Sequence, residues 1–371
     1  MKFLVSSIVL SNKLTAMSKV FHPKAQPIFA NFLFEVENES LRITASDGEC
    51  TQCSILPLAM TEGDGKICLP ADRLLDALKN LSEQPIAFAI DEVTFATSIK
   101  YANGKYDLVG LSANEYPISP VLAGIEKQVS IDAPILNIAI SQSLFAVSED
   151  SIRPIMTGIY FTISDGMFQS VATDAHKLVR NSYKLDTPVE SFDFVLPLKA
   201  AKIIKNLTSK QTAPITVTHN GREAIFTFKD ESFRCRLLEG CYPNYNAIIP
   251  NEHSHMATIE RESLLSAIKR VNIFTSVATG CIILDFIGTC LGISGKDIDF
   301  STSAEETLFC AYAGEPLRIG FKSEYIKLIL ENISSKEVVI KMCSPSKAAI
   351  ILPAIEDKKI ENLSLIMPMA I

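Results

Sequence analysis

The chain has 371 residues, of which 47% are hydrophobic and 21% are charged, and this composition is typical of folded globular proteins rather than of disordered chains. Its formal net charge is −7, which excludes a protein that grips nucleic-acid phosphates over its whole surface; any such contact must come from local basic clusters. The sequence has no apolar run near the roughly 20 residues of a membrane-spanning helix, so we expect no membrane partner.

The nine cysteines are an odd number scattered over a long chain, which predicts thiols in a reducing, cytoplasmic compartment. Cys50 and Cys53 form a single C-x-x-C pair, and no second pair or suitably spaced histidines follow to complete a zinc site. His253 and His255 are a weak metal signal that we interpret as part of a solvated linker. We therefore expect neither a metal nor another cofactor.

In chain order, a strand-helix unit comes first, and it occurs three times. Each copy predicts a short strand followed by an amphipathic helix whose apolar residues lie three or four positions apart. The expected strands begin at Phe3, Val129 and Ala257. Residues 3–10 also have the length of a short signal-peptide core, but no convincing cleavage site follows, and the repeat uses them as folded structure.

A hairpin and a second strand-helix unit follow in each copy. Alternating apolar residues and turns such as Asp165-Gly166 predict hairpins at residues 32–47, 159–174 and 282–297. The second units are expected at residues 66–81, 194–207 and 317–329, and further hairpins turn at Asn103-Gly104, Asn220-Gly221 and residues 344–346.

The three copies predict an α+β protein of three tandem similar domains, each made of two strand-helix-hairpin halves. We place the domains at residues 1–124, 125–253 and 254–371, because polar, proline-bearing junctions run through residues 116–127 and 242–255. Consecutive similar domains favour a curved array or a closed ring.

Near the middle of the chain, residues 171–180 place Asp174 and His176 in a polar turn between two expected strands. By residue type alone, the pair could be the catalytic pair of a hydrolase, part of a ligand loop or an ordinary turn. No GxSxG, HExxH or complete phosphate-loop motif supports an enzyme.

Four motifs then point to a family. They are residues 153–158 (Arg-Pro-Ile-Met-Thr-Gly), 172–178 (Ala-Thr-Asp-Ala-His-Lys-Leu), 237–245 (Leu-Leu-Glu-Gly-Cys-Tyr-Pro-Asn-Tyr) and 366–369 (Ile-Met-Pro-Met). Each is moderately specific alone, but in this order, on a threefold repeat, they make the whole chain resemble the bacterial DNA polymerase III beta subunits, the replicative DNA sliding clamps.

The resemblance implies the DNA clamp fold: a head-to-tail homodimer forms a ring, with helices lining the hole and sheets outside, and duplex DNA of any sequence passes through it. It implies a processivity factor without catalytic activity that tethers the DNA polymerase III alpha subunit and is opened by an ATP-driven clamp loader. Other polymerases and repair proteins with short clamp-binding motifs would use it too, in the bacterial cytoplasm at the nucleoid. A three-repeat peptide-binding scaffold that does not encircle DNA, and a hydrolase using Asp174 and His176, remain the alternatives.

The resemblance also implies an apolar pocket for partner peptides, completed by the C-terminal strand. Carried over, its residues are Met156, Thr173, Ala175, His176, Lys177, Leu178, Pro243, Ile248, Tyr325, Ala348, Leu365, Met367, Pro368 and Met369. This sequence departs from the family pattern in having Ala175 where Gly is common, Lys177 where Arg is usual, and Ala247 and Ala370 where a basic residue is often found. We therefore expect the pocket to rank partner motifs differently.

Two further surfaces are expected. Basic residues that recur on helices or loops of the three repeats would contact DNA phosphates: Lys24, Arg73, Lys79, Lys199, Lys202, Lys205, Lys269 and Arg270. By resemblance, the dimer interface would contain Lys105 and Tyr106 on one chain and Ile273, Phe274, Glu305 and Glu306 on the other.

Overall fold

The computed structural model describes residues 1–117, 122, 124, 126–185, 191–355 and 360–371. Its internal contacts divide the chain into two compact units, one made of Met1–Leu136 with Lys202–Leu237 and the other of Asn137–Ala201 with Leu238–Ile371. The expected junction at residues 116–127 lies partly outside the described residues, since 118–121, 123 and 125 are not among them.

The first unit contains two sheets. In chain order its elements are β1 (Lys2–Ser6), α1 (Ser7–Met17), η1 (Ser18–Val20), η2 (Pro27–Ala30), β2 (Asn31–Glu37), β3 (Ser40–Ser46), β4 (Cys50–Pro57), β5 (Met60–Glu62), β6 (Gly65–Pro70), α2 (Ala71–Lys79), β7 (Pro85–Ile90), β8 (Ala96–Tyr101), β9 (Gly104–Val109), η3 (Ala113–Glu115), β10 (Lys127–Asp132), β15 (Pro214–His219), β16 (Glu223–Thr227) and β17 (Glu231–Arg236). The five-stranded sheet has the order β5-β1-β7-β8-β9, and the eight-stranded sheet has the order β10-β15-β16-β17-β4-β3-β2-β6.

The second unit has the same kind of architecture. Its elements are η4 (Leu144–Ala146), η5 (Pro154–Thr157), β11 (Gly158–Ser164), β12 (Met167–Thr173), β13 (Lys177–Lys184), β14 (Phe192–Pro197), η6 (Tyr245–Ile248), β18 (His255–Glu260), α5 (Arg261–Asn272), β19 (Cys281–Ile287), β20 (Cys290–Asp297), β21 (Thr302–Phe309), β22 (Ala311–Ala313), β23 (Leu317–Lys322), α6 (Ser323–Glu331), β24 (Glu337–Met342), β25 (Ala349–Pro353) and β26 (Ile360–Ile366). A nine-stranded sheet has the order β14-β11-β12-β13-β26-β25-β24-β18-β22, and a four-stranded sheet has the order β21-β20-β19-β23. One boundary between the two units falls inside helix α3 (Ala133–Ser143), and the next falls inside helix α4 (Leu198–Thr208).

The expected strand-helix units are confirmed in all three repeats: β1-α1, β10-α3 and β18-α5 are the first units, and β6-α2, β14-α4 and β23-α6 are the second. Helix α5 shows why such a sequence folds this way. Leu264, Ile268 and Val271 lie on one helical face and are buried in the same core as strands β19 and β20. Burial of each such side chain contributes about 1.5–3 kcal/mol.

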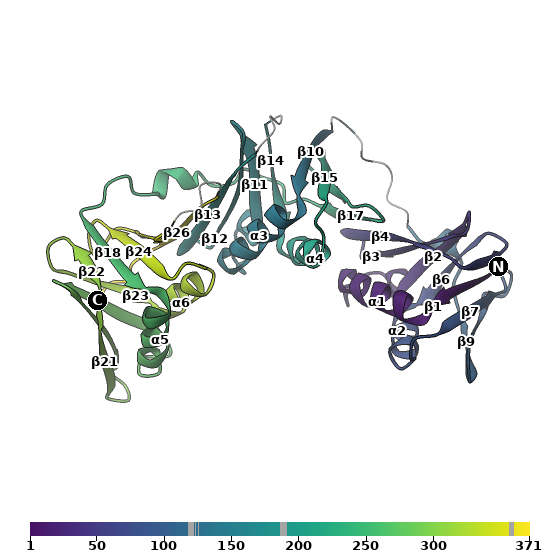
Figure 1. The fold of residues 1–371 in the computed structure, drawn as a ribbon, viewed down its shortest axis with the longest axis horizontal. Helices are drawn as coiled ribbons and strands as arrows, with labels where there is room; N and C mark the ends of the chain where they lie inside the picture. Colours follow the sequence, from purple (N-terminus) through teal and green to yellow (C-terminus); the bar gives the residue numbers. More distant parts are fainter. Residues whose placement is uncertain (118–121, 123, 125, 186–190, 356–359) are drawn as a thin grey trace. The chain divides into compact units, whose positions relative to one another are not determined.

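Antiparallel strand pairs join neighbouring repeats (Figure 1). Strand β4 of the first repeat pairs with β17 of the second, and β13 of the second repeat pairs with β26 of the third. The two large sheets are therefore each shared by two repeats. No helix among the described residues is both long and apolar enough to cross a membrane.

Candidate functional site

The central turn between β12 and β13 is held by its own side chains. The Asp174 carboxylate accepts the backbone N–H of His176 at 2.9 Å and that of Lys177 at 2.8 Å. The Thr173 hydroxyl accepts the Ala175 N–H at 3.1 Å and donates to the carbonyl of Lys177 at 2.8 Å. Ala175 has φ = 75°, in the left-handed region that an alanine rarely adopts. Asp174 and Thr173 thus define the turn, and Ala175 adopts a conformation that glycine would adopt without strain.

A buried cation lies under this turn. The Lys177 side chain is only 6% exposed and pairs with the Asp174 carboxylate. Its ammonium lies 4.6 Å from the centroid of the Tyr325 ring, and the ammonium of Lys322 lies 4.9 Å from the same centroid. The His176 ring stacks with Tyr325 at a centroid distance of 5.9 Å. The two ammonium groups attract the Tyr325 ring by cation–π interaction, and the His176 ring packs against it.

The same contacts argue against the hydrolase hypothesis. A catalytic triad needs a carboxylate that orients the histidine and a histidine that contacts a nucleophile. Here the Asp174 carboxylate binds turn N–H groups and Lys177, and the His176 ring stacks on Tyr325. The nearby hydroxyl of Thr173 is occupied by hydrogen bonds within the turn. The geometry is that of a structural turn.

The C-terminal segment is fixed beside the turn by backbone hydrogen bonds. Strand β26 pairs with β13 so that Leu365 lies opposite Leu178. Beyond the strand, the Met367 N–H donates to the carbonyl of His176 at 2.8 Å. The Met369 N–H donates to the carbonyl of Gly320 at 2.8 Å. Segments that are far apart in the sequence therefore form one surface.

A cavity of about 520 Å³, here named the Met367 groove, opens on this surface. It is lined by residues 247–252, Cys343, Ser346, Lys347, Ala348 and Met367. A buried apolar cluster includes Ala348 from its lining, together with Val171, Leu178, Tyr245 and Leu365. The partly exposed Met367 can adapt its flexible thioether to apolar ligands of different shapes. The groove can accept an apolar side chain from a bound peptide.

The structure brings most of the expected pocket residues together. Ile248, Ala348 and Met367 line the groove. Backbone bonds, strand pairing, packing or ring contacts connect a further set to it or to the adjacent turn: Thr173, Ala175, His176, Lys177, Leu178, Tyr325 and Leu365. Met369 instead bonds to Gly320 of strand β23. Of the other expected residues, Met156 is buried on η5, Pro243 is exposed and Pro368 follows Met367. The peptide-binding role of the whole expected set stays a prediction.

Sequence reasoning missed two cations and part of the groove wall. Lys322 lies over Tyr325, and Lys347 lines the groove. Residues 249–252 also line the Met367 groove. Outside the groove lining, the ring of Tyr242 stacks on the ring of Tyr160 with a centroid distance of 4.8 Å. Burial raises the pKa of the Tyr242 hydroxyl. The signal that could have indicated the wall is the apolar run Ile248-Ile249-Pro250 inside a junction that the sequence analysis interpreted as a polar linker.

The basic residues expected to contact DNA fall into three groups. Lys199 and Lys205 on helix α4 are half-buried. In the described part of the chain, no ion pair engages Lys24, Arg73, Lys79 or Lys202, and all four are exposed.

The last two basic residues of helix α5 are already paired with acids. Lys269 lies 2.8 Å from the carboxylate of Glu331. Arg270 makes two hydrogen bonds of 2.7 Å to Glu306, and these hydrogen bonds lower the pKa of the Glu306 carboxyl. The sequence assigned Arg270 to a DNA surface and Glu306 to a dimer interface; the structure shows that they bind each other, and both roles stay predictions.

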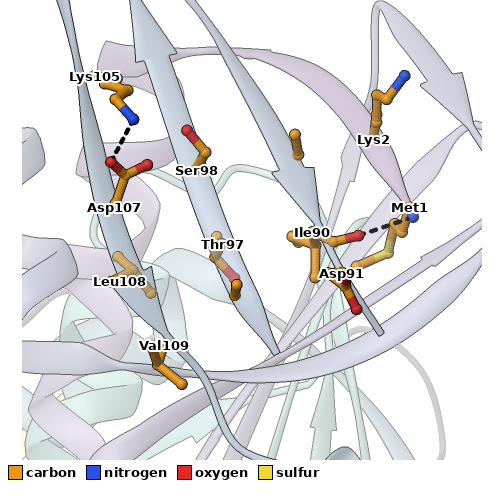
Figure 2. Close-up of a pocket in the computed structure, with 12 residues that line it drawn as sticks. Met1, Lys2, Ile90, Asp91, Thr97, Ser98, Lys105, Asp107, Leu108 and Val109 are labelled. Atoms are coloured by element: carbon orange, nitrogen blue, oxygen red, sulfur yellow. Dashed lines mark hydrogen bonds and ion pairs between the residues drawn. The ribbon is translucent and has the colours of Figure 1, made fainter. Parts of the chain in front are cut away.

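Edge strands β9 and β21 each leave one side without a neighbouring strand among the described residues. Strand β9 is the last strand of the five-stranded sheet, and β21 is the first of the four-stranded sheet. Figure 2 shows Lys105 and Asp107 of β9 beside a cavity of about 640 Å³, where their side chains form an ion pair at 2.7 Å. In the second unit, Ile273 is 76% exposed. Such open edges attract further strands unless they are protected.

Comparisons with known proteins cover nearly the whole chain. Three family profiles match it in order, namely the N-terminal domain of the DNA polymerase III beta subunit at residues 1–122, the central domain at residues 130–244 and the C-terminal domain at residues 246–370. The chain is 25% identical to the beta sliding clamp of Synechococcus elongatus, over 95% of this chain and 96% of the relative. It is likewise 25% identical to the beta sliding clamp of Staphylococcus epidermidis, over 96% and 97% of the two chains.

The fold is also found in solved structures. A DNA polymerase sliding clamp from Pseudomonas aeruginosa, crystallised with a ligand, matches with a TM-score of 0.94 and 24% identity over 100% of both chains. At this level of identity the match shows the fold, which is the three-domain arrangement of mixed helices and sheets expected from the sequence.

Proposed function

Because the chain belongs to the DNA polymerase III beta subunit family, we propose that it is a sliding clamp, a non-catalytic ring that encircles duplex DNA and keeps a polymerase on its template. The observation that carries this proposal is the joining of three similar repeats by shared sheets, with edge strand β9 on the first repeat and edge strand β21 on the third. Two copies arranged head to tail can pair these edges twice and so close a ring.

The chemistry of the two edges supports this pairing. Strand β9 carries Lys105, which in the single chain forms an exposed ion pair with Asp107, and strand β21 carries Glu305, so Lys105 would exchange or share its acidic partner across the interface. The exposed apolar side chains of Ile273, Phe274 and Phe309 would be buried by a second copy. A ring also leaves neither edge open to uncontrolled association.

We further propose that the exposed cations Lys24, Arg73, Lys79 and Lys202 face the DNA, with Lys199 and Lys205 on the same helix as Lys202. Such contacts to phosphates alone carry no sequence information and exchange quickly, which sliding requires. Because Lys269 and Arg270 are paired with acids, we assign them a smaller share of the DNA contact.

The Met367 groove would then bind the short apolar motifs of the partners. We propose as partners the DNA polymerase III alpha subunit, the clamp loader, and other polymerases and repair proteins. An apolar anchor in a rimmed pocket is the usual mode for such peptides. We also propose domain boundaries near residues 124 and 253, and a location in the cytoplasm at the nucleoid.

Retention on DNA tests the ring. The protein is loaded onto nicked circular DNA with a clamp loader, and the circle is then cut once with a restriction enzyme. We expect the protein to stay on the circle and to leave the linear DNA within the time of the assay, because only topology holds it. Equal retention on both forms would refute encirclement and favour the peptide-binding scaffold.

Substitutions on the basic surface test the DNA contact. Lys202→Ala should lower loading and retention more than Arg270→Ala, because the Arg270 charge is already neutralised by Glu306. The salt dependence of DNA binding should also become shallower by about one phosphate contact for Lys202→Ala. Equal effects of the two substitutions would contradict the division of the basic residues.

Peptide titration tests the groove. We expect the Met367→Ala variant to bind a short apolar clamp-binding peptide about 10- to 100-fold more weakly than the wild-type protein does, because truncation of a central anchor contact typically lowers affinity by this much. Met60→Ala is the matched control, because Met60 is an exposed methionine on strand β5, away from the groove lining. If Met367→Ala binds the peptide with unchanged affinity and is retained normally on circular DNA, the proposal that this groove binds the peptide is wrong, whereas the proposal of a ring is unaffected.

A further inference from the structure

Two cysteines face each other where the first and second repeats are joined. In the antiparallel pair of β4 and β17, Cys50 lies directly opposite Cys235 (Figure 1 shows the two strands side by side). One step beyond them, the Arg236 N–H donates to the carbonyl of Glu49 at 2.9 Å. At the other end of the ladder, the Ile55 N–H donates to the carbonyl of Asp230 at 3.0 Å.

These two hydrogen bonds fix the alternation of the ladder. Hydrogen-bonded pairs recur at every second residue of an antiparallel pair, and the pairs between them bring their side chains closer, with Cα atoms about 4.5 Å apart. Counting one residue inward from Glu49 and Arg236 places Cys50 and Cys235 at such a close, non-hydrogen-bonded position. Directly opposed residues also project from the same face of the sheet.

Both cysteine side chains are enclosed on the inner face. Cys235 is 0% exposed and Cys50 is 4% exposed. Burial raises the pKa of the Cys235 thiol well above its usual value, and the neighbouring Cys50 is a further cause. Attack by either thiol therefore requires a local opening.

The position of the pair allows such an opening. Strand β4 begins at Cys50 and β17 ends at Arg236, so the cysteines lie at the end of the ladder, where strands fray most easily. When the end opens, the Cys50 thiol regains contact with water, where a free cysteine thiol is partly ionised near neutral pH.

The spacing suits a disulfide that is reversible rather than permanent. Disulfides require Cα atoms about 4.4–6.8 Å apart and Cβ atoms about 3.5–4.5 Å apart. Directly opposed residues have Cβ atoms about 4.5–5.5 Å apart, and those at a close, non-hydrogen-bonded position are at the short end of this range, so the strands must approach only slightly to form the bond. The resulting strain makes the disulfide more easily reduced than a structural one.

We propose that Cys50 and Cys235 are a reversible thiol–disulfide site that locks the join between the first and second repeats. The oxidant is a low-molecular-weight disulfide such as glutathione disulfide. The Cys50 thiolate attacks one sulfur of this disulfide, so that a mixed disulfide forms and one glutathione thiolate leaves and takes up a proton. The Cys235 thiolate then attacks the Cys50 sulfur, so that the protein disulfide forms and a second glutathione thiolate leaves and takes up a proton. Overall, the protein loses two electrons and two protons, and the glutathione disulfide is reduced to two glutathione thiols.

The lock would reinforce contacts that are otherwise non-covalent. The join is held by the β4–β17 ladder, by the ion pair of Lys13 with Glu231 and by that of Arg236 with Glu49. A disulfide would add a covalent link between residues that are distant in sequence, which removes much of the freedom of the opened chain. The site uses none of the residues of the Met367 groove or of strand β9, so it does not depend on the proposed clamp function.

Redox equilibration of the full chain tests the proposal. The protein is kept in glutathione buffers of increasing oxidised-to-reduced ratio, with urea below the unfolding transition so that strand ends open locally. After acid quenching and digestion, mass spectrometry should find a peptide linked through Cys50 and Cys235, two hydrogen masses lighter than its parts and cleaved by dithiothreitol. In the oxidised protein, hydrogen exchange of the β4 and β17 amides should slow at least tenfold.

Two substitutions give the matched comparison. Cys235→Ser should abolish the linked peptide, whereas Cys53→Ser should leave it intact, because Cys53 lies opposite Ser232, on the other face of the strand. The wild-type measurement stands even if Cys235→Ser folds poorly. If both cysteines remain thiols at the most oxidising ratio, or if Cys50 links to Cys53 instead, the proposal is wrong.

Discussion

The pair of Asp174 and Lys177 gives a direct test of what holds the central turn. Removal of one partner from a buried ion pair costs about 3–5 kcal/mol, because the other charge is left uncompensated. In Asp174→Asn the amide oxygen can still accept the two backbone N–H groups, but the ammonium of Lys177, which is 6% exposed, loses its counter-charge. We therefore expect a loss of about 3 kcal/mol, at the low end of that range.

The reciprocal substitution should cost less. Lys177→Met keeps the apolar stem and removes the ammonium, while the Asp174 carboxylate retains its two backbone donors. We expect a loss of about 1–2 kcal/mol, part of which is the cation–π contact with Tyr325. The double variant has no unpaired charge, so it should be destabilised by about 1–2 kcal/mol as well, and the two single effects should not add.

Native-state hydrogen exchange of the β12 and β13 amides is the suitable assay, because it reports the free energy of opening of this hairpin in a chain with several cores. Lys322→Met is the control: Lys322 also lies over Tyr325, but it is more exposed and lies 4.0 Å from Glu324, so we expect a loss below about 0.5 kcal/mol. If the double variant loses the sum of the single effects, within about 0.5 kcal/mol, the ion pair does not hold the turn.

Two further predictions concern strain and charge. Ala175→Gly should stabilise the hairpin by about 0.5 kcal/mol, because the strain relieved in the left-handed conformation (φ = 75°) exceeds the entropy gained by the unfolded chain. As the control, Ala172→Gly in strand β12 should destabilise the hairpin by about 1 kcal/mol. If the same exchange experiment shows a loss of stability at both positions, Ala175 is not strained. For Glu306, the pKa in the folded protein is lowered by the hydrogen bonds from Arg270, so the stabilisation is present above the usual glutamate pKa and is lost as the pH falls through the lower folded value. The difference in unfolding free energy between wild type and Glu306→Gln should therefore shrink from pH 6 to pH 3. A difference that grows toward low pH would have the wrong sign.

Local patterns predicted the order of elements well. The alternation in residues 159–174 and the Asp165-Gly166 turn correspond to strands β11 and β12, and the apolar spacing around Leu264 and Ile268 corresponds to helix α5. These features depend on neighbours within a few residues, where periodicity carries the information. The turn at Asp174 was also predicted, because Asp, Thr and a following strand are a local signal.

Contacts between distant segments were beyond such patterns. No periodicity in the sequence indicated that β17 pairs with β4 or that Cys50 meets Cys235, since register between strands so far apart depends on the packing of both repeats. The pairing of Arg270 with Glu306 has the same cause. Each charge looked available for a separate surface when judged along its own segment.

The pairing of β13 with β26 has a consequence for the timing of biosynthesis. Asn181 and Asn362, which are hydrogen-bonded across this pair, are 181 residues apart in sequence. At about 5–20 residues per second, the ribosome reaches the second strand about 10–40 s after the first. During that interval the edge of β13 has no partner from β26, and the Met367 groove lacks the residue after which it is named. A nascent chain therefore has its first two repeats well before the Met367 groove is complete, and a translation product that stops before β26 lacks the Met367 part of the groove lining.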